Sequence, residues 1–180
     1  GIIGIGRIGT GVLQYLQGFG SPKILVNDII YDNNLDKKFN IEWSDKETIY
    51  QRADVITIHT PLTAKTKDMI KKEQLLSMKE DAIIINTARG GIINEQDLYE
   101  VMQDGHLSGA AIDVFDFEPY NGKLKEIHRC ILTAHMGSMS VDCRTRMEIE
   151  ATEEVVRFLT DQPLESVVPE EEYAVQREGL

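Results

Sequence analysis

The chain begins with a glycine-rich turn between an apolar run and a helical pattern. Residues 2–3 lead directly into Gly4-x-Gly6-x-x-Gly9. Apolar side chains then recur with a helical period, at Ile8, Val12, Leu16 and Phe19. The three glycines have separate roles, because Gly4 makes a tight turn, Gly6 lets backbone approach a pyrophosphate, and Gly9 packs the helix against the strand. This order of strand, turn and helix predicts a dinucleotide-binding unit.

An acidic residue follows at the distance that such a unit requires. The apolar run 24–26 ends at Asn27 and Asp28, whose carboxylate can accept hydrogen bonds from ribose hydroxyls. The same charge repels a 2′-phosphate, so Asp28 favours NAD over NADP. The helix N-terminus adds N–H groups and partial positive charge for the phosphates. The competing interpretation, a glycine turn before a surface helix, is much weaker once strand, helix and Asp28 all fall in place.

The charge balance and the two cysteines narrow the class of protein. The formal net charge is −11, from 19 basic and 30 acidic residues, and the basic residues form no stripe. We therefore expect neither nucleic acid nor an anionic membrane as partner. No apolar run approaches the ~20 residues of a membrane span. Cys130 and Cys143 show no CxxC spacing, which predicts reduced thiols in a cytoplasmic protein and no metal site.

Strand and helix patterns alternate along the chain. Apolar, β-branched runs predict strands at 24–26, 54–58, 82–86, 109–113 and 130–133, with a short one at 39–41. Helices are expected near 45–52 and 72–78 and from Asn94, a capping residue, to Gly105, which stops the helix. Such alternation predicts an α/β fold: a Rossmann-type, doubly wound parallel sheet with helices on both faces.

Polar residues whose side chains can bind or react with a ligand follow the ends of these predicted strands. The strand ends read Thr60-Pro61, Asn86-Thr87-Ala88-Arg89-Gly90, 113–119 and Thr133-Ala134-His135-Met136-Gly137-Ser138. Ligands of open parallel sheets bind outside the carboxyl ends of the strands. An arginine fork can hold a carboxylate at two points, and an imidazolium can give a proton to a carbonyl oxygen. A neighbouring carboxylate would favour the charged imidazole. Reduction of a 2-oxo acid needs this set of groups.

Several ordered motifs together resemble one family. The motifs are Gly4-x-Gly6-Arg7-Ile8-Gly9, His59-x-Pro61-Leu62-Thr63, Asn86-Thr87-Ala88-Arg89-Gly90-Gly91, Asp113-Val114-Phe115 with Glu118-Pro119, and Thr133-x-His135-x-Gly137-Ser138. They resemble the D-isomer-specific 2-hydroxyacid dehydrogenases, in particular the phosphoglycerate dehydrogenase-like members. The resemblance covers residues 1 to about 140 and is far more specific than a glycine motif alone.

The resemblance implies a role for each matching residue. Arg89 would bind the substrate carboxylate, His135 would be the general acid and base, and Glu118 would orient and charge His135. The implied cofactor is NAD. Its expected contacts are Gly4, Gly6, Arg7, Ile8 and Gly9 at the pyrophosphate, Asp28 at the ribose, Thr60 and Pro61 beside the adenosine, Thr87, Ala88 and Asp113 at the nicotinamide, and Arg89, His135 and Gly137.

The same resemblance implies the domain organisation. Residues 1–139 would form the dinucleotide-binding domain. Residues 140–180 would be a C-terminal helix and tail leading to a substrate domain that this chain lacks. The chain is therefore expected to be a fragment of a larger NAD-dependent enzyme, with a homodimer as its assembly. The apolar stripe of the last helix, at Met147, Ala151, Val155 and Phe158, is predicted to face a core, and Glu170–Glu172 to be a solvated tail.

Two details depart from the family pattern, and two other functions stay open. Ala134 replaces the usual proline before His135, and the segment from Glu118 to His135 is shorter than usual. The expected reaction is hydride transfer between nicotinamide and C2 of a D-2-hydroxy acid or 2-oxo acid, such as phosphoglycerate, glycerate or hydroxypyruvate. The first alternative is an NAD(H)-sensing, corepressor-like binding protein of the same fold. Formate dehydrogenase is disfavoured, because its relatives carry glutamine in place of Glu118.

Overall fold

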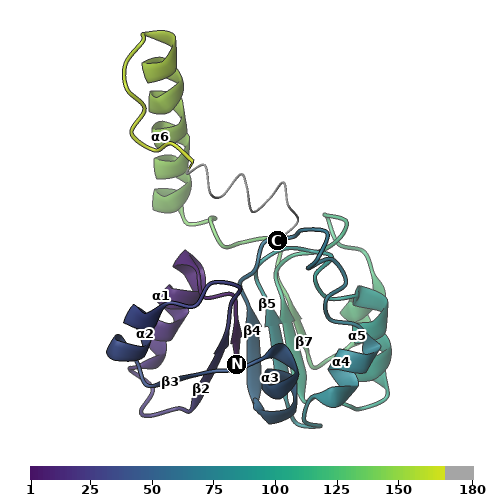
Figure 1. Cartoon of the computed structure of the whole chain (residues 1–180). Helices are drawn as coiled ribbons and strands as arrows, with labels where there is room; N and C mark the ends of the chain where they lie inside the picture. Colours follow the sequence, from purple (N-terminus) through teal and green to yellow (C-terminus); the bar gives the residue numbers. More distant parts are fainter. Residues whose placement is uncertain (169–180) are drawn as a thin grey trace. The chain divides into compact units, whose positions relative to one another are not determined.

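A parallel β-sheet forms the first of two compact units of the chain. The computed structural model describes residues 1–168, and its first unit spans Gly1–Ala134. Seven strands lie in the order β3-β2-β1-β4-β5-β6-β7 (Figure 1). Their bounds are β1 (Ile2–Ile3), β2 (Ile24–Asn27), β3 (Ile41–Trp43), β4 (Val55–Ile58), β5 (Ile83–Asn86), β6 (Gly109–Ile112) and β7 (Cys130–Leu132). The chain order reverses between β1 and β4, where open sheets of this kind bind ligands.

The connecting helices confirm the α/β alternation. They are α1 (Arg7–Leu16), α2 (Asn33–Lys38), α3 (Lys46–Arg52), α4 (Lys72–Ser77) and α5 (Glu95–Gln103), with a 3₁₀ turn η1 (Lys123–Glu126). Asp45 caps α3 by accepting a hydrogen bond from the Thr48 N–H at 2.7 Å. Asn94 caps α5 in the same way, accepting from Asp97 at 3.1 Å. The predicted Rossmann-type, doubly wound fold is therefore confirmed.

Two apolar cores lie on opposite faces of the sheet. Successive side chains of a strand point to opposite faces, and β1 shows this with its two residues. Ile2 packs with Leu13 of α1 and with residues near α2, whereas Ile3 joins the larger cluster that includes Ile49 of α3 and Leu98 of α5. Figure 1 shows α1 and α2 at one side of the sheet and α4 and α5 at the other. The all-apolar run of β1 is thus buried from both sides.

The helices α1 and α2 pack on one face of the sheet but leave part of that face exposed. Ile56 and Ile84, which point to the larger core, are fully buried. Their neighbours on the opposite face are not: Val55 is 44% exposed, Ile83 37% and Ile131 67%. Within the described residues of the first unit, the helices on this face therefore stop short of β4–β7.

Two local expectations were wrong. The segment 31–45 contains α2, which begins because Asp32 accepts a hydrogen bond from the Asn34 N–H at 2.8 Å. The strand that follows is Ile41–Trp43 instead of 39–41. The helical period of Ile8, Val12, Leu16 and Phe19 predicted one apolar face for α1, but the buried residues of α1 are Gly9 and Leu13, and Ile8 and Phe19 are largely exposed. Phe19 follows the end of the helix at Leu16, so the helical period no longer places it.

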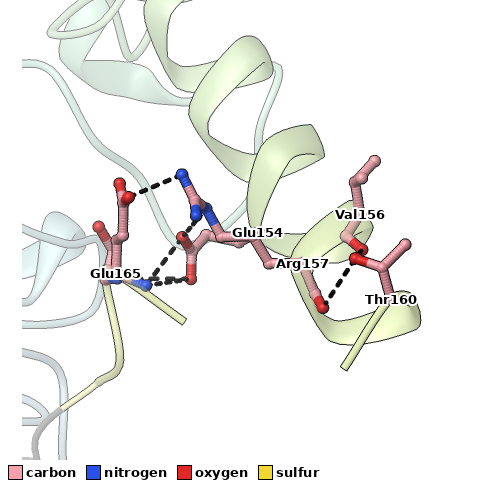
Figure 2. A network of polar contacts seen from close by, with 6 residues as sticks. Glu154, Val156, Arg157, Thr160 and Glu165 are labelled. Atoms are coloured by element: carbon pink, nitrogen blue, oxygen red, sulfur yellow. Dashed lines mark hydrogen bonds and ion pairs between the residues drawn. The ribbon is translucent and has the colours of Figure 1, made fainter. Parts of the chain in front are cut away.

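The second unit begins at His135 and contains α6 (Val141–Leu159), which Ser140 caps through the Cys143 N–H at 3.2 Å. Its apolar stripe was predicted to face a core. Within the described residues α6 buries none of its residues, and Phe158 is 71% exposed, so that prediction stays untested in this chain. After α6 the chain turns back, and Arg157 lies between Glu154 and Glu165, 2.7 Å from the Glu165 carboxylate (Figure 2). The stripe therefore needs contacts beyond its own unit to be buried.

Two further expectations concern the termini and membranes. Glu170–Glu172, predicted as a solvated tail, lie outside the described residues. Over residues 1–168, no helix combines the length and the apolar character that a membrane span requires.

Because one face of the sheet is covered and the other is partly open, two adjacent residues of β5 should contribute differently to the free energy of unfolding. Ile84→Ala removes fully buried methyl groups and should lower the free energy of unfolding by about 2–5 kcal/mol. Ile83→Ala, on the exposed face, is the matched control and should cost clearly less. Urea titration of the chain in dilute solution measures both. Equal losses would contradict the assignment of a covered and an uncovered face.

Candidate functional site

The glycine turn packs tightly on one side and is open on the other. Gly4 has φ +93°, and a Cβ there would lie 2.7 Å from the carbonyl of His59. A Cβ on Gly9 would lie 2.0 Å from the Gly4 carbonyl oxygen. At Gly6, by contrast, apart from Gly6 itself and its two chain neighbours, no atom of the described residues lies within 4 Å of the Cβ position. Gly4 and Gly9 thus permit close packing, and Gly6 leaves room for a ligand at the end of β1.

The start of α1 lies next to Gly6 and presents the backbone N–H groups of a helix N-terminus. Gly6 is the N-cap, and within residues 1–168 no side chain caps this helix. The first turn also carries no acidic residue. Arg7 and Ile8, both exposed, form the first turn. Uncapped N–H groups and the helix dipole favour an anion such as a pyrophosphate.

Asp28 connects the end of β2 to the glycine turn. One carboxylate oxygen accepts a hydrogen bond from the Ile5 N–H at 2.6 Å, and the other accepts from the Ile30 N–H at 3.0 Å. A carboxylate has about four acceptor positions, so two remain for ribose hydroxyls. Asp28 therefore holds the turn in place and still presents negative charge beside it. The bond to Ile5 is a structural role that the sequence pattern did not indicate.

The loop after β4 contacts the turn mainly through its backbone. The ring of His59 lies 3.0 Å from the Thr57 hydroxyl, and burial lowers the pKa of His59, which favours the neutral ring. The Thr60 hydroxyl is buried and has no hydrogen-bond partner among the described residues. The Pro61 carbonyl accepts a hydrogen bond from Thr66 at 2.7 Å. A buried hydroxyl without a partner costs ~1–3 kcal/mol, so the Thr60 hydroxyl fits a loop in which a bound ligand supplies the missing hydrogen bond.

A buried asparagine shapes the loop that carries Arg89. Asn86, 2% exposed, donates from its amide nitrogen to the Arg89 carbonyl at 2.9 Å. Its amide oxygen accepts from the Ala88 N–H at 3.1 Å. Thr87, Ala88 and Arg89 are thereby held in one compact turn, with the Arg89 side chain exposed. Sequence reasoning did not single out Asn86 as a positioning residue, although an asparagine that opens a turn is a known signal.

The loops after β5, β6 and β7 are joined to one another. A Cβ on Gly90 would lie 2.1 Å from the Phe115 carbonyl, so the Arg89 loop and the Phe115 loop are in direct contact. Asp113 is 7% exposed, and its N–H donates to the Asn86 carbonyl at 3.0 Å. The Thr133 hydroxyl donates to the Asp113 carboxylate. Thr133 is a second positioning residue that sequence reasoning missed.

Glu118 lies in the same group of loops. Its carboxylate accepts a hydrogen bond from the Phe115 N–H at 3.0 Å. It borders a pocket of about 400 Å³ that Tyr120, Leu132 and Thr133 also line. The structure thus places Thr87, Ala88, Arg89, Asp113 and Glu118 in the two loops that follow β5 and β6, where the sequence predicted them; their roles stay predictions.

His135 and Gly137 belong to the second unit. His135 has φ +54°, a left-handed conformation that histidine adopts more readily than most residues. Its pairing with Glu118 stays a prediction. In the first unit, the open side of Gly6, the uncapped helix and the Asp28 carboxylate fit the phosphates and ribose of a dinucleotide.

Comparisons with known proteins agree with this site. The family described as "D-isomer specific 2-hydroxyacid dehydrogenase, NAD binding domain" matches residues 1–137. D-3-phosphoglycerate dehydrogenase of Bacillus subtilis is 37% identical over 169 residues, 93% of this chain and 32% of that protein. Glyoxylate reductase of Korarchaeum cryptofilum is 34% identical over 182 residues, 100% of this chain and 54% of its own length.

Solved structures give the same result. D-lactate dehydrogenase of Lactobacillus jensenii, crystallised with NAD⁺, has a TM-score of 0.82 at 26% identity, covering 93% of this chain and 54% of that one. The TT0316 protein of Thermus thermophilus has a TM-score of 0.85 at 31% identity, covering 93% and 52%. The chain thus spans about a third to a half of the length of these relatives.

The surroundings of Gly6 and Gly9 predict that Gly6 matters for cofactor binding and Gly9 for the stability of the fold. Gly6→Ala should leave the free energy of unfolding nearly unchanged but weaken NADH binding roughly tenfold or more, because its methyl group enters the ligand space. Gly9→Ala, the matched control, should instead destabilise the chain by about 1–3 kcal/mol through its clash with Gly4. Fluorescence titration and urea unfolding measure the two effects. A Gly6→Ala chain that binds NADH normally would contradict the assigned role of Gly6.

Cofactor choice should depend on Asp28. We expect tighter binding of NAD(H) than of NADP(H), because the Asp28 carboxylate accepts ribose hydroxyls and repels a 2′-phosphate. Asp28→Ala should narrow this difference. The substitution should also weaken the binding of both cofactors, since the Ile5 N–H loses its acceptor. Asp32→Ala, which removes a nearby helix cap, is the control. Tighter binding of NADPH than of NADH by the unmodified chain would refute the prediction.

Proposed function

Because this chain belongs to the D-isomer-specific 2-hydroxyacid dehydrogenase family through its NAD-binding domain, we propose that the whole protein is an NAD-dependent oxidoreductase. It transfers a hydride between nicotinamide and C2 of a small D-2-hydroxy acid or 2-oxo acid. The observation that carries this proposal is the direct contact of the Arg89 loop with the loop that bears Glu118, at the same edge of the sheet as the glycine turn.

Three side chains share the chemistry in this proposal. When bound, NAD supplies the acceptor or donor of the hydride. The Arg89 guanidinium holds the substrate carboxylate at two points, a geometry that a lysine ammonium cannot reproduce. His135 donates a proton to the carbonyl oxygen during reduction and removes it during oxidation. The Glu118 carboxylate orients the imidazole of His135 and favours its protonated form.

Asn86 supports this arrangement without touching substrate. Its two hydrogen bonds hold the Ala88 N–H and the Arg89 carbonyl, so the backbone that carries the guanidinium is rigid. Such preorganisation matters because small displacements of a positioning group lower the rate steeply.

The names of the relatives support a small-acid substrate. They include D-3-phosphoglycerate dehydrogenase, glyoxylate reductase and, from Thermotoga maritima, hydroxypyruvate reductase, which is 34% identical over 163 residues. We accordingly propose phosphoglycerate, glycerate, hydroxypyruvate or a similar acid as substrate. A cytoplasmic location and a homodimer complete the proposal, the first on the grounds of two free cysteines, Cys130 and Cys143.

Kinetics of the full-length protein with a panel of 2-oxo acids and NADH tests the three roles. Arg89→Lys should mainly raise KM. His135→Ala should lower kcat for reduction by roughly 10²-fold or more. His128→Ala is the matched control, because His128 is an exposed histidine of the same stretch and should not affect kcat.

Glu118→Gln gives a pH readout that a merely structural role would not move. Without the negative charge the protonated imidazole is less favoured, so activity in reduction should disappear at a lower pH as the pH rises. A profile that is unshifted, or shifted upward, would show that Glu118 is not the partner of His135. NADH binding without turnover of any 2-oxo acid would instead favour the NAD(H)-sensing alternative.

A further inference from the structure

The loop that carries Glu118, residues 113–119, is fixed at Phe115 but exposed just after it. The Phe115 backbone lies so close to Gly90 that a Cβ there would approach the Phe115 carbonyl to 2.1 Å. The Tyr120 ring stacks on the Phe115 ring, with centroids 4.1 Å apart. Asp116, between Phe115 and Glu118 in the chain, is exposed. Packing alone therefore does not hold the segment that leads to the Glu118 carboxylate.

A hydrogen bond from a distant helix holds Asp116 instead. Glu95 lies in the first turn of α5, and its carboxylate accepts a hydrogen bond from the Asp116 N–H at 2.8 Å. Glu95 is half-buried. Burial raises the pKa of the Glu95 carboxyl, the bond from the Asp116 N–H opposes that shift, and the Asp116 carboxylate adds to it. Because a carboxylate partly removed from water is costly without hydrogen bonds, this bond is favoured over a solvated side chain.

The residue held by Glu95 also touches the loop that carries Arg89, residues 87–91. Gly91 has φ +76°, and a Cβ there would lie 2.7 Å from a carboxylate oxygen of Asp116. The Asp116 side chain therefore lies against the backbone two residues after Arg89. A displacement of Asp116 would thus reach both the Arg89 loop and the Glu118 loop.

Glu95 could also act locally, within its own helix. An acidic side chain in the first turn stabilises a helix through the helix dipole, and α5 carries both Glu95 and Asp97 there. That effect needs no contact with another loop. Glutamine separates the two roles, because Glu95→Gln keeps an oxygen that can accept the Asp116 N–H but removes the charge.

We propose that Glu95 is a positioning residue of the active site, which fixes the Glu118 loop against the Arg89 loop through the Asp116 N–H. This inference rests on the function proposed above. In this role Glu95 touches neither substrate nor cofactor. It sets the distance between the guanidinium that holds the substrate carboxylate and the carboxylate that orients His135. A misplacement of about 1 Å between such groups lowers a rate by roughly 10²-fold.

Kinetics of the full-length protein, with NADH and the 2-oxo acid that it reduces fastest, tests the role. Glu95→Ala should lower kcat roughly ten- to a hundredfold and raise the KM for the 2-oxo acid. The KM for NADH should be nearly unchanged, since Asp28 and His59 hold the glycine turn. Glu95→Gln should restore most of the activity.

Gln96→Ala is the matched control for these kinetics. Gln96 is the next residue of α5, is exposed, and bonds to Glu100 within the same helix at 2.9 Å. Its loss should leave kcat and both KM values as in the unmodified protein.

Amide hydrogen exchange of the chain, followed by NMR, tests the contact without any turnover. In Glu95→Ala the Asp116 N–H should exchange roughly tenfold faster or more, because it loses a charged acceptor. Glu95→Gln should show a smaller increase. The Asp113 N–H donates to the Asn86 carbonyl at 3.0 Å and should keep its rate, which makes it the internal reference.

The two measurements distinguish this inference from the proposed function. An unmodified protein that reduces no 2-oxo acid would overturn the proposed function, while faster exchange at Asp116 in Glu95→Ala would still support the contact. Unchanged exchange at Asp116 would overturn the contact itself. In an active protein, the positioning role fails if Glu95→Ala keeps normal kinetics, or if Glu95→Gln or Gln96→Ala loses as much activity as Glu95→Ala.

Discussion

The close approach of two backbone segments, at Gly4 and His59, is the constraint on which the site depends. A side chain at Gly4 would collide with the His59 carbonyl, so only glycine lets the first turn lie against the loop after β4. That contact sets the position of α1, whose N-terminus has no side-chain cap. The loops after β5–β7 are held instead by buried polar groups, since Asp113 bonds both to Asn86 and to Thr133. Each such bond contributes only ~1 kcal/mol net, but a buried polar group without a partner costs more, so these residues specify one loop arrangement.

The covering of the sheet is uneven, and this has consequences for the whole unit. The face under α3–α5 holds the larger core, which contains Ile56 and Ile84. On the other face, Val55 and Ile83 remain partly exposed. Apolar side chains on both faces of a central strand are typical of a parallel sheet that is covered on both sides. The composition of β4 and β5 thus anticipates a covering that the first unit alone does not supply.

The local signals of the chain were sufficient for the fold and for the placement of several candidate site residues at the ends of strands. The glycine motif, the capping residues Asp45 and Asn94, and the apolar runs of β4–β6 depend on neighbours a few residues away, so their pattern is legible in the sequence. The positions of Arg89, Asp113 and Glu118 at the ends of strands followed from the rule that parallel strands end at one edge.

What only the tertiary structure decided depends on partners far apart in the chain. The bond of Asp28 to Ile5, the contact of Gly90 with Phe115, and the bond of Thr133 to Asp113 join residues that no local pattern links. The inward side of α1 was likewise decided by packing, because Gly9 had to face Gly4 and the apolar Ile8 and Phe19 were left outside. Periodicity shows that a helix has an apolar side, but the shape of the surface it meets determines which residues are buried.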